Sequence, residues 1–172
     1  MEKTQKFPTE VVDLPSRGKL YPPDSPLASG TIEMKYMTAK EEDILTNQNY
    51  IEKGIVIDKL LQALIVDKTI DYNQILIGDK NALLIAARIL GYGKDYEFEY
   101  MGSKESIDLS LLNNKELNAE VAKAKENSFN FTLPATGKVL TFKLLSHGDE
   151  QKIDSEVKGL KKINKESSAE LS

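Results

Sequence analysis

The chain has 172 residues, of which 40% are hydrophobic and 29% are charged, and its formal net charge is −4. This length and composition are typical of one globular domain that buries a core without cross-links. The absence of cysteine and the single histidine exclude disulfides, thiolate zinc sites and cysteine nucleophiles, and the acidic balance argues against a non-specific nucleic-acid binder.

The first 30 residues form an unusual segment because they contain five of the six prolines. Proline removes backbone donors and blocks helix continuation, so we predict an extended proline-rich arm over residues 1–30. Apolar residues such as Leu14, Leu20 and Leu27 would not be needed in a merely solvated tail. We therefore expect the arm to lie on a surface, its own or a partner's, and to serve partner binding rather than folding.

The next segment begins an α+β core domain that we place over residues 31–146. Apolar and polar residues alternate over Thr31–Met37, which predicts a half-buried strand. Thr38 with Glu41 three residues later indicates a helix N-terminus with a capping box. Apolar residues at helical spacing then predict a helix over Gly54–Val66.

A short helical turn is expected over Asp71–Ile77, followed by a helix over Lys80–Leu90 with Asp79 as its cap. This helix is apolar on nearly every face, so we predict that it is the central buried one. Gly91 and Gly93 are expected to end it.

The pattern then changes to period two and predicts two β-hairpins. The first pairs residues 96–100 with 106–110, and the second pairs Phe129–Leu133 with Val139–Leu145. A thin amphipathic helix is expected between them over Asn114–Lys125.

The C-terminal part begins with Ser146 and Asp149, which form a second predicted capping box. A highly charged helix over Glu150–Lys165 follows, and residues 147–172 are interpreted as this helix with a frayed tail. The predicted fold class is therefore α+β, with a central helical cluster, small antiparallel β-hairpins and a charged C-terminal helix.

No residue pattern in the sequence indicates a catalytic residue, a cofactor-binding residue or a metal ligand. His147 is the only histidine, and no serine or aspartate can be placed beside it, so we interpret it as structural or exposed. Two alternatives to a protein that acts only through protein contacts remain open. One is an enzyme that uses carboxylates such as Asp13, Asp43 and Asp79. The other is a nucleic-acid-binding module that uses the lysines of the last helix, namely Lys152, Lys158, Lys161, Lys162 and Lys165.

Three segments carry a resemblance to a known family: Val12–Tyr21 (VDLPSRGKLY), Met37–Thr46 (MTAKEEDILT) and Leu76–Gly93 (LIGDKNALLIAARILGYG). Together, and in this order, they resemble the baseplate hub and tail-assembly proteins of T-even-like contractile-tailed bacteriophages. The likeness covers roughly residues 11–110. Relatives carry a Cys-x-x-Cys pair at the tip of the first hairpin, where this chain has Met101–Lys104, so no zinc is expected. Relatives also continue past the charged helix, so Ser172 ends either a short member or an incomplete reading frame.

The resemblance implies a late, non-enzymatic protein of the tail, either a hub subunit or an assembly factor that chaperones the tape-measure protein or another hub protein. Its expected partners are other tail or baseplate proteins, with neither nucleic acid nor membrane among them. The expected location is the host cytoplasm during assembly, and a place in the virion baseplate stays open. The residues that we expect to bind the partner are Leu14, Pro15, Arg17, Gly18, Leu20, Tyr21 and Arg88.

Overall fold

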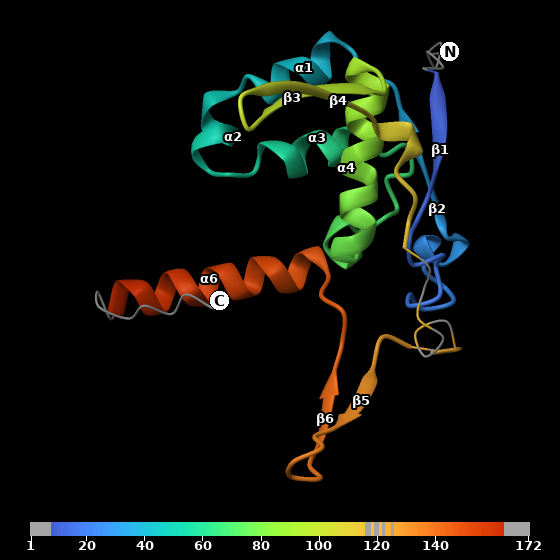
Figure 1. The fold of residues 1–172 in the computed structure, drawn as a ribbon, viewed down its shortest axis with the longest axis vertical. Coiled ribbons are helices and arrows are strands. Elements are labelled where there is room, and N and C mark those ends of the chain that lie inside the picture. The colour runs from blue at the N-terminus through green and yellow to red at the C-terminus, as the bar shows by residue number, and fades with distance from the viewer. Residues whose placement is uncertain (1–7, 116–117, 119–120, 122, 125, 164–172) are drawn as a thin grey trace.

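The computed structural model describes residues 8–115, 118, 121, 123, 124 and 126–163, without side-chain detail for 161–163. It confirms the α+β class, with helices and three two-stranded antiparallel sheets in the described part of the chain (Figure 1). The elements follow in the order β1 (Thr9–Asp13), η1 (Pro26–Ser29), β2 (Thr31–Lys35), α1 (Ala39–Leu45), α2 (Gln48–Glu52), α3 (Val56–Leu64), η2 (Tyr72–Gln74), α4 (Ile77–Tyr92), β3 (Asp95–Tyr100), β4 (Ser103–Asp108), η3 (Leu109–Leu111), β5 (Phe129–Thr132), β6 (Val139–Phe142) and α6 (His147–Ile163).

The proline-rich segment is part of the core, which corrects our expectation that it is dispensable for folding. Within it, β1 pairs antiparallel with β2 so that Val12 lies opposite Ile32. The chain then folds back and buries Leu14, Leu20 and Leu27. Burial of these side chains stabilises the folded state through the hydrophobic effect. Residues 9–30 are therefore integrated with the domain that follows them.

A tight turn at Arg17 and Gly18 makes this packing possible. Both residues have a positive φ, at 53° and 74°, a region that glycine adopts without steric penalty. A Cβ atom on Gly18 would lie 2.4 Å from the carbonyl oxygen of Ala28. Only glycine fits at this position, so the sequence Arg17-Gly18 serves the fold of the segment itself.

Helices α1 and α3 pack against each other, and α4 lies between them and the β1–β2 sheet (Figure 1). The predicted capping box starts α1, because the Glu41 carboxylate accepts hydrogen bonds from the backbone and hydroxyl of Thr38. Helix α3 buries Leu60, Leu61 and Leu64, as its spacing predicts. Residue 57, expected on the same face, is instead exposed. An isolated bridge between Met34 and Ile65 joins β2 to the end of α3.

Helix α4 begins three residues earlier than predicted and is buried on one face only. Leu83 and Ala87 face the core, whereas Leu84 and Ile85 are more than a third exposed. The helix that we predict to be the central buried one therefore buries this one face and leaves another exposed. Its last turn ends at Gly93, which has a φ of 81°.

The second predicted hairpin, β5–β6, and the charged helix α6 extend from this body, whereas the β3–β4 hairpin lies at the end of α4 (Figure 1). In the first hairpin Tyr96 pairs with Ile107, and in the second Phe129 pairs with Phe142. Helix α6 is attached mainly at its first turn, where Gly148 packs against Asn73 of η2. The helix that we predict over residues 114–125 lies largely outside the described residues.

Candidate functional site

A buried carboxylate, Asp79, joins the N-terminal segment to helix α4. Its side chain is 1% exposed. Oδ1 accepts a hydrogen bond from the backbone of Ser16 at 2.9 Å, and Oδ2 accepts from the hydroxyls of Ser16 and Tyr21, each at 2.6 Å. A buried charge needs such partners because it has lost its hydration. Asp79 therefore does not cap the helix as predicted; it anchors residues 16–21 instead.

The Tyr21 hydroxyl completes this junction because it both donates and accepts a hydrogen bond. The oxygen donates to Asp79 and accepts a hydrogen bond from the backbone N–H of Leu76 at 2.9 Å. Burial, followed by the hydrogen bond to the Asp79 carboxylate, raises the pKa of Tyr21 far above its ordinary value. The phenol therefore stays protonated and holds the start of α4 against the N-terminal segment.

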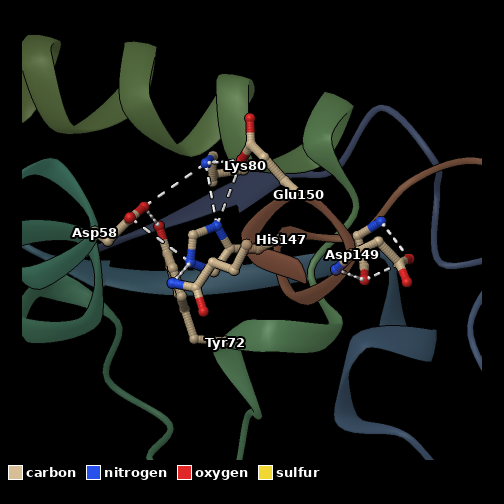
Figure 2. A network of polar contacts seen from close by, with 8 residues as sticks. Asp58, Tyr72, Lys80, His147, Asp149 and Glu150 are labelled. Atoms are coloured by element: carbon tan, nitrogen blue, oxygen red, sulfur yellow. Dashed lines mark hydrogen bonds and ion pairs between the residues drawn. The ribbon is translucent and has the colours of Figure 1, made fainter. Parts of the chain in front are cut away.

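A second polar cluster surrounds His147 at the start of α6 (Figure 2). Lys80 of α4 lies 2.8 Å from Glu150 and 3.7 Å from Asp58 of α3. Tyr72 of η2 donates to Asp58 at 2.9 Å and packs edge-on against the imidazole, with ring centroids 4.8 Å apart. The cluster thus connects four elements of the fold through charged and aromatic groups.

Both nitrogens of the imidazole have polar neighbours. Nδ1 lies 3.2 Å from the Lys80 ammonium and 3.6 Å from the Glu150 carboxylate. Nε2 lies 3.6 Å from the Asp58 carboxylate and 2.9 Å from the amide nitrogen of Gln151. His147 is only 2% exposed. A ring held on both nitrogens and shielded from solvent positions α6 and does not face a substrate, so the structural interpretation holds.

The structure also places the carboxylates of the enzyme alternative. Asp13 and Asp43 are exposed, whereas Asp79 is buried and fully engaged with Ser16 and Tyr21. Within the described residues, no three Asp, Glu or His side chains gather in a way that could hold a metal ion. These acids therefore do not form the converging set that the enzyme alternative requires.

Four of the five lysines of the nucleic-acid alternative lie on α6. Lys152 and Lys158 are exposed and interleave with Asp154 and Glu156. Lys165 lies outside the described residues, as do the side chains of 161 and 162. The described part of the helix therefore presents mixed charge rather than a basic face.

Most residues that we predict to bind a partner are not available to one. Leu14, Gly18, Leu20 and Tyr21 are buried in the core, which corrects their assignment as partner-binding residues. Pro15 is half-buried, and only Arg17 is exposed. These residues pack together within the N-terminal segment. The spacing of apolar residues among prolines fits both a segment that packs into its own core and one that binds a partner, so the sequence did not separate the two.

Arg88 stands apart from this group, at the root of the β3–β4 hairpin. Its guanidinium donates to the carbonyl oxygens of Gly93 at 2.9 Å and Asp95 at 3.3 Å. It also lies over the rings of Tyr92 and Tyr96, 5.3 and 5.6 Å from their centroids. Arg88 therefore fixes the direction in which the hairpin leaves α4.

The surface that sequence reasoning missed is the apolar face of the hairpins. The alternating residues predict the two hairpins but not what covers them, and every residue of β3 is exposed. Exposed apolar side chains continue on the second hairpin and on α6. The members of this set are Tyr96, Phe98, Tyr100, Met101, Ile107, Phe131, Val139, Leu140, Phe142, Ile153 and Leu160. The sequence did contain a signal for this surface, because no predicted sheet or helix was available to cover the apolar side of the alternating strands.

Comparison with protein-family models, with curated proteins and with solved structures finds no match for the chain. No helix in the described part of the chain is both long and apolar enough to cross a membrane.

Proposed function

We propose that this chain is a non-enzymatic hub subunit or hub-assembly factor of a contractile-tailed bacteriophage, and that it acts through protein–protein contacts. A chaperone of the tape-measure protein or of another hub protein is one form of this role. The proposal combines the family resemblance of the three sequence segments with the distribution of apolar surface on the molecule.

The observation that carries the proposal is the position of the exposed apolar side chains. Many of them lie on the two hairpins and α6, of which β5–β6 and α6 extend from the body (Figure 1), while the body has its own core. An isolated two-stranded hairpin is marginally stable in water, and contiguous exposed apolar patches mark interaction sites. A second protein that covers these elements would stabilise them.

The polar clusters support a protein without catalysis. In the described residues, every buried side-chain nitrogen and oxygen has a hydrogen-bond partner. Asp79 and His147 are both occupied by neighbouring side chains, so neither presents a free acid or base to a substrate. These groups join segments of the chain, which is a structural role.

The Asp79 junction joins two of the segments that carry the resemblance. Ser16 and Tyr21 belong to the first of these segments, and Asp79 belongs to the third. Two segments that are far apart in the sequence thus form one structural unit.

Disruption of the gene in its source genome tests the proposed function. We expect electron microscopy of the lysate to show heads without complete tails, because the resemblance implies a protein that is needed to build the hub of the tail. A copy supplied from a plasmid should restore tailed particles. Normal yields of tailed particles after disruption would contradict the proposal.

A further inference from the structure

A continuous aromatic surface runs from α4 onto the β3–β4 hairpin. Leu84, Arg88 and Tyr92 are spaced by four residues and so share one side of α4. Arg88 touches the rings of both Tyr92 and Tyr96, and Tyr96 stacks on Phe98 with centroids 6.0 Å apart. We call this surface the aromatic face and define it as Leu84, Arg88, Tyr92, Tyr96, Phe98 and Tyr100.

The register of the hairpin extends this surface across both strands. Paired residues of an antiparallel sheet share a face, so Ile107 lies beside Tyr96, and Glu105 lies beside Phe98. Tyr100 is 58% exposed although it is a large aromatic residue. Tyrosine and arginine are enriched at protein interfaces, where they contribute much of the binding energy. The composition of the aromatic face is therefore that of an interface.

The tip of the hairpin gives a second, independent observation. Met101 and Gly102 form a two-residue turn, with φ angles of 49° and 80°. Such turns favour asparagine, aspartate or glycine at the first position, because other side chains are strained there. Met101 is also 88% exposed. A flexible apolar side chain in a strained and solvated position contributes nothing to the isolated fold, but it can insert into a partner.

The charge of the hairpin specifies the chemistry of that partner. Residues 94–108 contain five acidic side chains and two lysines, and one of the lysines, Lys94, is paired with Asp108. Asp95, Glu97 and Glu99 alternate with the aromatic residues of β3 and so lie on the opposite face of the strand, whereas Glu105 lies beside Phe98. Arg88 adds one positive charge to the aromatic face. The hairpin as a whole is acidic, and its field repels the phosphates of a nucleic acid and attracts lysine and arginine side chains.

We propose that the aromatic face is the docking surface for a segment of another protein that is both apolar and basic. The proposal deepens the proposed function and rests on it only in taking the chain to act through protein contacts. Apolar side chains of the segment pack on Tyr96, Phe98 and Met101. Its lysine or arginine side chains reach Glu105, which lies beside Phe98 on the same face.

Because the chain has no cysteine, a single engineered cysteine gives a specific site for an environment-sensitive dye. Met101→Cys reports on the hairpin tip. Val139→Cys, at an exposed position of β6, is the matched control. The probes are an alternating leucine–lysine octapeptide, its leucine–glutamate counterpart and a thymidine oligonucleotide.

We expect the leucine–lysine peptide to shift the emission of the dye at position 101 and to bind at least about tenfold more tightly than the leucine–glutamate peptide. Added salt should weaken this binding, since the charges are exposed. Phe98→Ser should abolish it, whereas Phe131→Ser on the second hairpin should leave it unchanged. Circular dichroism melts of both variants show whether the fold is intact.

Three results would overturn the proposal: equal affinity for the two peptides, an equal response of the dye at position 139, or tighter binding of the oligonucleotide. Each of these would remove the aromatic face as the docking surface. Heads without tails after gene disruption would still support tail assembly, so failure of this inference is distinguishable from failure of the proposed function.

Discussion

Replacing Tyr21 with phenylalanine tests whether the N-terminal segment belongs to the core. The substitution keeps the buried ring and removes only the hydroxyl, which bonds the Asp79 carboxylate at 2.6 Å and the backbone N–H of Leu76 at 2.9 Å. A hydrogen bond to a charged group contributes about 1.5–3 kcal/mol, and one to a neutral group about 0.5–1.5 kcal/mol. We therefore expect Tyr21→Phe to lower the free energy of unfolding by about 2–4 kcal/mol, a large part of the roughly 5–15 kcal/mol typical of a domain.

The assay is equilibrium unfolding in urea followed by circular dichroism. Tyr36→Phe is the matched control, because the Tyr36 hydroxyl makes an exposed hydrogen bond to Glu10 at 3.5 Å. We expect this control to change the free energy of unfolding by less than about 0.5 kcal/mol. If both variants unfold at the same urea concentration as the wild type, the Asp79 junction does not hold the segment, and our account of the core is wrong.

Four further outcomes follow from the same structure. Deletion of residues 1–28 should abolish the cooperative melt, because it removes β1 and buried core residues; a retained melt would restore the idea of a separable arm. Leu83→Ala should lower the free energy of unfolding by about 2–5 kcal/mol, whereas Leu84→Ala on the exposed side of α4 should lower it by less than about 1 kcal/mol; equal losses in urea would show that both faces are packed. Hydrogen bonds from Lys143 and then from Ser146 lower the pKa of Asp149 to about 2, so its stabilising effect is present above its ordinary value of 3.8 and is lost as the pH falls towards 2; NMR titration of the carboxyl carbon should show this midpoint, and Lys143→Gln should raise it. EDTA should leave the melting temperature unchanged, and a decrease would reveal a structural metal.

Local patterns predicted the elements whose interactions are local. The capping boxes at Thr38 and Ser146 follow from residues three positions apart, and both form in the structure. The two hairpins follow from alternating strands joined by short turns. In each case the physical cause lies within a few residues, where the sequence displays it directly.

Contacts between distant residues could not be predicted in the same way. Strand β1 was interpreted as an arm because its partner, β2, comes only after the proline-rich turns. Asp79 was interpreted as a helix cap from its neighbours, whereas its real partners, Ser16 and Tyr21, are some sixty residues earlier. The short helix α2 was missed because a helix of this length has no complete apolar stripe.

The aromatic face of the β3–β4 hairpin shows the same limit of prediction from sequence. The alternation of Tyr96, Phe98 and Tyr100 correctly predicts a strand with one apolar face. It does not say whether that face meets the chain's own core or another molecule. Only the spatial arrangement, in which the face remains exposed, separates the two cases.

Photo-cross-linking in infected cells tests the central claim most directly. A benzoylphenylalanine at position 101, at the tip of the β3–β4 hairpin, reports what covers the aromatic face during assembly, and the same group at position 36 is the control. We predict that position 101 cross-links to a tail or baseplate protein through a segment that is apolar and basic, and that position 36 does not. Cross-linking of position 101 to nucleic acid, or the same products from both positions, would contradict the account.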